Sequence, residues 1–224
     1  MSERTIAIGD VHGCAVALAA LLDRLQPSPR DTIVLLGDYV DRGPDSRAVL
    51  ERLIALAGQC TLVPLLGNHE EMLLASRSDA DALQGWLRCG GVATIDSYGH
   101  GTHPRALPAD HLTFLESCRP YYETDRHIFL HANYEPGSPL DEQPPLTLRW
   151  CSLRDSMPQR RHISGKTVIL GHTPQENGDV LDRDFFVCID TYCYGGGWLT
   201  ALDVDRKTYW QVNDAGQFRD SPEV

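Results

Sequence analysis

Five short polar clusters along the chain carry side chains that commonly bind metal ions. They are Asp10 with His12, Asp38 with Asp41 and Arg42, Asn68 with His69, His131, and His172. Carboxylate oxygens, an amide oxygen and imidazole nitrogens, without a thiolate, suit divalent ions such as manganese, iron or zinc. An open site of this kind can activate water for hydrolysis. The sequence therefore predicts a divalent-metal centre with room for water.

Each of these residues taken alone has a simpler explanation. A single histidine usually packs in the core or on the surface, and an aspartate before a helix is usually an N-cap, as we expect for Asp45 and Asp79. All five clusters, however, directly follow an apolar run. Buried strands need no Asp, Asn or His at their ends, so the joint pattern favours one metal site.

The first three clusters lie in a repeated pattern of apolar run, polar loop and helix. Apolar runs at residues 5–8, 32–36 and 61–66 precede predicted helices at 14–25 (with Val16 in its apolar stripe), from Pro44 to about residue 57, and through 72–74. This alternation predicts βαβ units with largely parallel strands. Ligands of such sheets gather beyond the carboxyl ends of the strands. Asp10 and His12, two residues apart, would face one side of an extended segment.

The rest of the chain is predicted to hold shorter strands and one insertion. Strands are expected at 127–130, 166–170, 185–189, 198–204 and 208–212, without crossover helices between them and with the last two as an antiparallel hairpin. Residues 75–124 contain helical fragments near 82–87 and 108–118, separated by glycines. We interpret this range as a lid inserted into a single domain that spans residues 1–224.

Composition restricts the partners. The formal net charge of −11 and the pI of about 5.2 disfavour binding to nucleic acid or to an anionic membrane. No stretch approaches the roughly 20 apolar residues of a membrane span, and no secretory signal is evident, so we expect a cytoplasmic location. The seven cysteines form no CxxC pair, which indicates reduced, packed thiols. We expect a monomer.

The clusters resemble the motif series of the PPP phosphoprotein phosphatases, within the calcineurin-like metallophosphoesterases. The motifs are GDVHG at 9–13, GDYVDRG at 37–43, GNHE at 67–70, HA at 131–132 and GH at 171–172. Segments at 90–94, 97–99 and 190–202 are similar to the compact bacterial and phage-type branch, which is similar to symmetrical diadenosine tetraphosphate hydrolases. The resemblance implies an α/β fold with a βαβαβ core, mixed sheets flanked by helices, and a helical lid insertion.

The resemblance also implies two bound divalent metal ions, manganese before iron or zinc. Asp10, His12 and Asp38 would hold one ion, and Asp38, Asn68, His131 and His172 the other. Asp38 would then bridge them, and a hydroxide shared between the ions would attack the phosphorus directly.

Four further roles are implied by the family. His69 would protonate the leaving group, and Asp41 would hold its ring in the useful tautomer. Arg42 and Asn68 would bind phosphate, and the forked guanidinium of Arg42 suits that task. A second phosphate-binding arginine is expected near Trp150, where we favour Arg149 over Arg154, although either could be a surface arginine.

We predict a phosphatase of phosphomonoesters, acting on phosphoserine and phosphothreonine proteins, with phosphotyrosine as an extension. The alternative is a diadenosine tetraphosphate hydrolase, and a more distant one is a phosphate-binding module without turnover. The short chain and small lid favour the protein phosphatase, and the net charge of −11 slightly disfavours polyanionic dinucleotides. Lid residues Trp86, Arg88, Tyr98 and His103 should set the substrate class.

Overall fold

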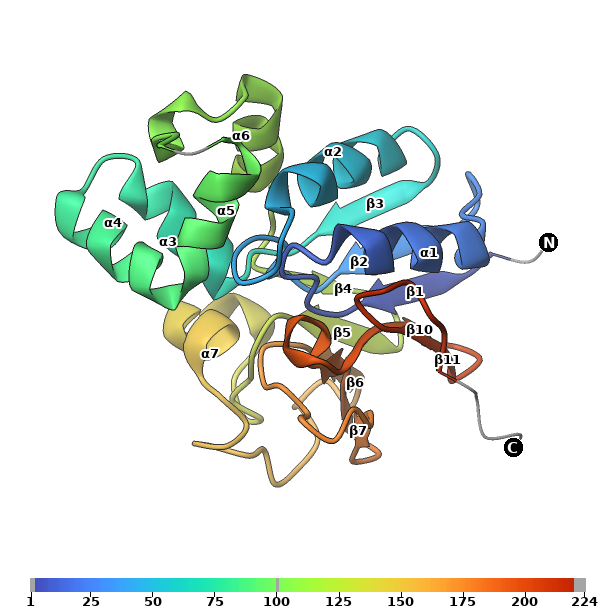
Figure 1. Ribbon diagram of the computed structural model, residues 1–224. Helices are drawn as coiled ribbons and strands as arrows, with labels where there is room; N and C mark the ends of the chain where they lie inside the picture. Colours follow the sequence, from blue (N-terminus) through green and yellow to red (C-terminus); the bar gives the residue numbers. More distant parts are fainter. Residues whose placement is uncertain (1–2, 100, 220–224) are drawn as a thin grey trace.

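Two mixed β-sheets form the centre of the molecule, in a computed structural model that describes residues 3–99 and 101–219 (Figure 1). The first sheet contains β1 (Thr5–Ile8), β2 (Thr32–Leu35), β3 (Thr61–Pro64), β9 (Asp190–Thr191), β10 (Trp198–Asp203) and β11 (Thr208–Val212). The second contains β4 (Tyr121–Glu123), β5 (His127–Leu130), β6 (Thr167–Leu170), β7 (Leu181–Asp182) and β8 (Phe186–Cys188). The strand orders are β11-β10-β1-β2-β3, with β9 beside β10, and β4-β5-β6-β8-β7.

Alternating side chains along the strands build the layers. Ile6 and Ile8 of β1 pack under α1 (Ala15–Leu25) and α2 (Ser46–Leu56), whereas Ala7 faces the second sheet. On β5, Phe129 shares this inter-sheet core, and its neighbours Ile128 and Leu130 face the other way. This period of two is the one expected of strands buried on both faces.

The strand directions explain why the motif loops meet. β1, β2 and β3 are mutually parallel, as are β5, β6 and β8, while β10 runs antiparallel to β1. Parallel strands place their carboxyl ends at one edge, so the loops after them emerge together. The mixed sheets and the β10–β11 hairpin confirm the predicted fold.

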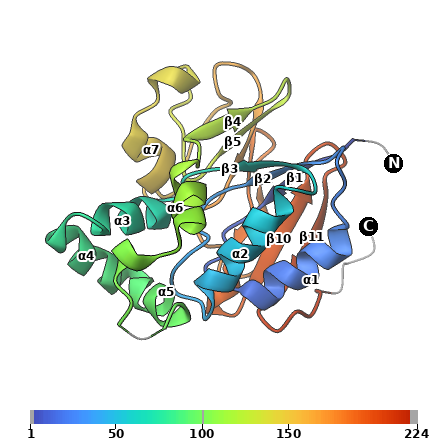
Figure 2. The same cartoon turned by 90° about the horizontal axis from the view of Figure 1, so that it is seen from above.

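A helical segment lies beside α2 on one side of the first sheet (Figures 1 and 2). It comprises α3 (Asn68–Ser76), α4 (Ala80–Trp86), a π-helical turn (Leu87–Gly91), α5 (Val92–Ser97), a 3₁₀ turn (Pro104–Ala106) and α6 (Ala109–Glu116). Two more 3₁₀ turns lie at Leu140–Glu142 and Cys193–Gly195. The proposed lid range 75–124 thus contains α4 to α6 and also strand β4, which the sequence did not indicate.

Several local predictions need correction. The second helix begins at Ser46 and not at Pro44, because Asp45 accepts a hydrogen bond from the amide of Ala48 and caps it. Asp79 caps α4 as expected. Val16 is 58% exposed, so it lies outside the apolar stripe of α1.

One connection was also missed. A short helix, α7 (Pro145–Trp150), stands between β5 and β6, where no crossover helix was predicted. It is only 6 residues long and begins at the second of two prolines, so its pattern is too brief for a periodicity argument. Within the described residues, no helix is both long and apolar enough to cross a membrane.

Candidate metal centre

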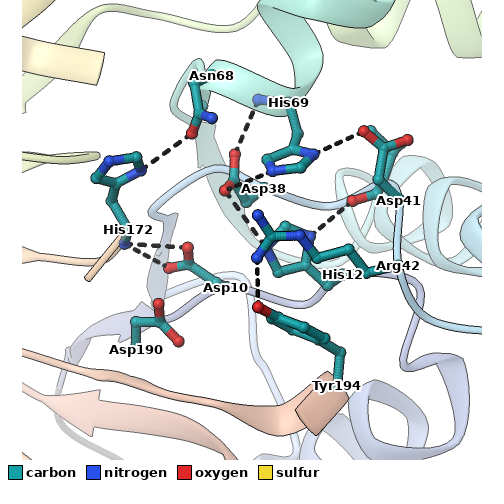
Figure 3. Close-up of polar contacts among 12 residues, drawn as sticks. Asp10, His12, Asp38, Asp41, Arg42, Asn68, His69, His172, Asp190 and Tyr194 are labelled. Atoms are coloured by element: carbon teal, nitrogen blue, oxygen red, sulfur yellow. Dashed lines mark hydrogen bonds and ion pairs between the residues drawn. The ribbon is translucent and has the colours of Figure 1, made fainter. Parts of the chain in front are cut away.

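The predicted side chains converge beyond the strand ends (Figure 3). The geometry at the first loop differs from expectation, because β1 ends at Ile8 and His12 has a φ of 42°. The segment is therefore not extended, and a turn, not strand alternation, brings Asp10 and His12 to the same site. A turn of this kind leaves no periodic signal in the sequence.

Two glycines of the motifs are required by close approach to the site. A Cβ on Gly67 would lie 2.2 Å from Oδ1 of Asp38, and one on Gly171 would lie 2.2 Å from Oδ1 of Asp10. Any side chain at either position would displace a carboxylate. These glycines serve the site directly, beyond their use as turn formers.

Asp38 belongs to two groups of potential metal ligands. His12, Asp38 and His69 form one group and Asp38, His131 and His172 the other, each with ligand atoms within 4.8 Å of one another. Oδ2 of Asp38 lies 3.4 Å from Nε2 of His12, and Oδ1 lies 3.4 Å from Nε2 of His131. One carboxylate therefore faces both groups, which fits a dinuclear centre.

The histidine tautomers fit metal binding. Nδ1 of His12 lies 2.8 Å from the carbonyl oxygen of Val40, and Nδ1 of His131 lies 2.8 Å from that of Leu36. A carbonyl can only accept, so each Nδ1 carries the proton and each Nε2 presents a lone pair towards Asp38. Backbone carbonyls that orient metal-binding histidines in this way are common outer partners.

The surroundings of Asn68 also test whether these side chains fit a bound metal ion. Its Oδ1 lies 2.9 Å from Nε2 of His131 and 3.0 Å from Nδ1 of His172. His172 also has Nε2 3.2 Å from the carbonyl of Trp150, which places its proton there. Three acceptor atoms then point at one another, an arrangement that a bound cation stabilises. The donor set thus fits the implied metal.

Asp10 lies at the edge of the centre. Its carboxylate accepts from the backbone amide of His172 at 3.1 and 3.0 Å. Burial, followed by the charges of Asp190 and Asp38, raises the pKa of Asp10 well above its usual value. Crowded buried carboxylates repel one another unless cations lie between them.

Asp190 had no predicted role, although it lies beside Asp10 (Figure 3). It is 2% exposed, and burial raises its pKa to about 6. It follows β8, so the strand-end rule that selected the other clusters could have identified it.

The charge state of Asp38 reflects its neighbours. Burial raises the pKa of the Asp38 carboxyl, whereas positive charge on the rings of His131, His69 and His12 lowers it well below its usual value. Burial lowers the pKa of His131 to about 4. An ionised carboxylate and a neutral imidazole are the forms that bind metals.

His69 and Asp41 form a buried pair next to Asp38. Nδ1 of His69 lies 2.7 Å from Oδ2 of Asp41, and its Nε2 lies 3.9 Å from Oδ2 of Asp38. Asp41 is 0% exposed and His69 is 1% exposed. The carboxylate fixes the proton on Nδ1 and leaves Nε2 facing the centre. The structure thus brings the predicted acid and its partner together.

Glu70 organises the loop that carries Asp38, and sequence reasoning gave it no role. Its Oε2 accepts from the amides of Asp38 and Gly67 at 2.8 and 3.1 Å, and its Oε1 accepts from Tyr39 at 2.8 Å. Glu70 stands at the third position of α3, where a glutamate commonly reaches back to the helix start. That capping signal could have revealed it.

The predicted phosphate-binding arginines lie in different surroundings. Arg42 is exposed, and its guanidinium donates to the hydroxyl of Tyr194, with Cζ 4.7 Å from that ring's centroid. The Tyr194 ring also packs 4.8 Å from the ring of His12. Tyr194, in a turn without periodic pattern, was not singled out from the sequence.

Arg149 is held by an acidic partner. Its Nε and Nη2 donate to both oxygens of Glu71 at 3.0 and 2.9 Å. Arg154 instead donates to the carbonyl of Pro174 and to Glu176. The choice of Arg149 over Arg154 as a phosphate ligand stays a prediction.

Comparisons with known proteins agree with this site. The family model described as calcineurin-like phosphoesterase matches residues 3–205. The chain is 33% identical to a symmetrical bis(5'-nucleosyl)-tetraphosphatase of Edwardsiella ictaluri over 262 residues, covering 88% of this chain and 91% of that protein. It is 32% identical to serine/threonine-protein phosphatase 1 of Salmonella typhimurium over 203 residues, covering 86% and 88%. A solved structure of a candidate diadenosine tetraphosphatase superposes with a TM-score of 0.69 at 24% identity, covering 95% and 94%.

The family match extends over nearly the whole chain. The chain therefore belongs to the calcineurin-like metallophosphoesterases.

Proposed function

We propose that the chain hydrolyses P–O bonds of anionic phosphate compounds at the centre organised by Asp38. The observation that supports this most is the single carboxylate facing both groups of metal ligands, with the His69–Asp41 pair beside it. Two divalent cations, manganese in our proposal, would supply an activated water and neutralise phosphate charge.

The protein's own residues would divide the remaining work. Arg42 and Asn68 would orient the phosphate, and His69 would give the Nε2 proton to the leaving oxygen as the P–O bond breaks. Asp41 would stabilise the protonated ring before that transfer. The burial of His69 and Asp41 keeps bulk water from this proton.

For the substrate, we propose dinucleoside tetraphosphates first. Cleavage in the middle of such a molecule by one water gives two nucleoside diphosphates, and the relative from Edwardsiella ictaluri is named for this activity. This choice departs from our sequence-based preference for phosphoproteins, because the tetraphosphatase match covers slightly more of the chain at similar identity.

Phosphoserine and phosphothreonine proteins are the second candidate, favoured by a specific observation. The match to the Salmonella typhimurium phosphatase runs over 203 residues, fewer than the 224 of this chain, whereas the tetraphosphatase match runs over 262. The tetraphosphatase therefore carries insertions that this chain lacks. Added segments of that kind could hold a nucleoside, and their absence favours a more open site.

One experiment separates these substrates. Metal-stripped protein, reconstituted with manganese, is given diadenosine tetraphosphate and a phosphoserine peptide at equal concentrations, and kcat/KM is measured for each. Faster release of ADP supports the dinucleotide substrate, and faster release of phosphate from the peptide supports the second candidate. Absence of turnover on both, and on p-nitrophenyl phosphate, with metal bound, would overturn the proposed hydrolysis.

A further inference from the structure

Beyond α3, the helical segment beside α2 contacts the Asp41 carboxylate through two side chains. Nε1 of Trp86 donates to Oδ2 of Asp41 at 2.8 Å, and Oγ1 of Thr94 donates to Oδ1 of Asp41 at 2.7 Å. His69 shares Oδ2 at 2.7 Å. Trp86 is 1% exposed and Thr94 is 0% exposed. Both oxygens of the Asp41 carboxylate are therefore engaged inside the protein.

Thr94 holds the backbone of Asp41 as well as its side chain. The amide of Asp41 donates to Oγ1 of Thr94 at 2.9 Å and to Oγ of Ser46 at 3.0 Å. The hydroxyl of Thr94 has one hydrogen, which goes to the carboxylate, so Ser46 must donate across the 3.0 Å between the two hydroxyls. Thr94 thus restrains Asp41 at two points, the backbone amide and the carboxylate. The φ of Asp41 is 73°, which is unfavourable for an aspartate and requires restraint of this kind.

Two glycines let the segment approach this closely. A Cβ on Gly91 would lie 2.5 Å from the Trp86 indole, and one on Gly90 would lie 2.8 Å from Cγ of Arg42. The carbonyl of Gly90 also accepts from the amide of Arg42 at 3.2 Å. The segment is therefore fitted to both the His69 partner and the predicted phosphate-binding arginine.

We propose that Trp86 and Thr94 are positioning residues, which fix the Asp41 carboxylate so that the His69 ring presents Nε2 to the leaving group. The inference rests on the proposed function, in which His69 is the proton donor. A carboxylate held by two donors cannot rotate about its own axis, so its bond to His69 keeps one direction. Without the hydroxyl of Thr94, Oδ1 would be buried without that partner, and the carboxylate would turn to recover a hydrogen bond.

The test uses esters whose leaving groups differ in their need for a proton. Thr94→Val removes the hydroxyl at nearly constant shape, Thr94→Ser keeps it, and Thr113→Val, at an exposed threonine of α6, is the matched control. We expect Thr94→Val to lower kcat/KM on phenyl phosphate about ten- to hundredfold. On p-nitrophenyl phosphate, which needs little protonation, the loss should stay below about threefold. Thr94→Ser should restore most activity, and the bound manganese should be unchanged.

A double-mutant cycle distinguishes positioning from general loss of structure. In a His69→Asn background, Thr94→Val should cost nothing further on phenyl phosphate, because the step it supports is already absent. Equal losses on both esters, or additive losses in the cycle, would overturn the inference. The proposed function would be unaffected by that result, because the wild type would still hydrolyse phosphate compounds. A wild type silent on all phosphate compounds would instead remove the proposed function. Should Thr94→Val not fold, Trp86→Phe, which removes one N–H, takes its place in the same series.

Discussion

The loops that follow the two sheets contribute different chemistry to the centre. Those after β1, β2 and β3 carry the shared carboxylate Asp38, the buried pair of His69 and Asp41, and the exposed arginine Arg42. Those after β5 and β6 carry neutral ligands, His131 and His172. The first sheet therefore supplies charge and proton transfer, and the second completes the coordination.

Left-handed backbone is frequent in the first set of loops, and His172 in the second set shares it with a φ of 63°. Asp38, Asp41 and Arg42 all have left-handed φ values, of 51°, 73° and 68°. Such conformations cost about 1–3 kcal/mol each and persist where the surroundings impose them. Here Glu70 binds the amides around Asp38, and Thr94 binds the amide of Asp41. The residues with the most chemistry are thus those held against their own backbone preferences.

The largest expected effect follows from removing the charge that both ligand groups share. Asp38→Asn should lower kcat/KM on p-nitrophenyl phosphate by more than the roughly 10–100-fold typical of an outer-partner change. It should also lower the bound manganese measured by atomic emission. Asp214→Asn, at an exposed turn, is the control. Near-normal turnover in Asp38→Asn would show that the first sheet does not hold the shared ligand.

The next effect concerns the division between proton transfer and coordination. His69→Asn should slow phenyl phosphate hydrolysis by about 10²–10⁴-fold and p-nitrophenyl phosphate hydrolysis far less, because a good leaving group needs no acid. Gln84→Asn, at an exposed glutamine of α4 in the same helical segment, should change neither rate. Parallel losses on both esters would mean that His69 acts as a ligand, as its place in one metal-binding group also allows.

Much of this difference between the two sets of loops could be predicted from the sequence, because the functional residues come directly after the ends of strands. Apolar runs followed by Asp, Asn or His predicted five of the strands and the meeting point of their loops. The turn at His12 and the support from Trp86 and Thr94 were not visible as roles. They depend on φ values and on contacts between distant residues, such as Thr94 with Asp41, which no local periodicity records.

The same limit explains the second sheet. β4 has 3 residues and β7 has 2, too few for a pattern of alternation. They form because β5 and β8 offer open edges for pairing. Their existence is a property of the assembled sheet and not of their own residues.

Metal removal tests whether the centre joins the two sets of loops. Ions bound at about 100 times their Kd add about 3 kcal/mol of stability, so chelation should lower the Tm by about 5–10 °C. Adding manganese should restore it. In His172→Asn, which lacks a ligand from the second sheet only, the shift should be smaller. An unchanged shift in that variant would show that His172 does not hold the metal.

The smallest effect compares an ion pair at each sheet. Asp31, which precedes β2, is 1% exposed and accepts from Nε and Nη2 of Arg4 at 2.8 and 2.7 Å. Hydrogen bonds from Arg4, against a smaller effect of burial, lower the pKa of Asp31 to about 2. Beside the second sheet, Asp184 pairs with Arg161 at 2.9 Å, but their side chains are 86% and 38% exposed.

A lowered carboxyl pKa stabilises the folded state above the unfolded value of about 3.9, and this contribution is lost as the pH falls through about 2. Asp31→Asn should therefore cost about 2 kcal/mol of unfolding free energy at pH 7, measured in urea, and less at pH 3. Asp184→Asn should cost under about 0.5 kcal/mol at either pH, because water screens the exposed pair. Equal costs at the two sites, or a cost at Asp31 that does not change with pH, would contradict the view that the buried pair at the first sheet contributes more stability than the exposed pair at the second.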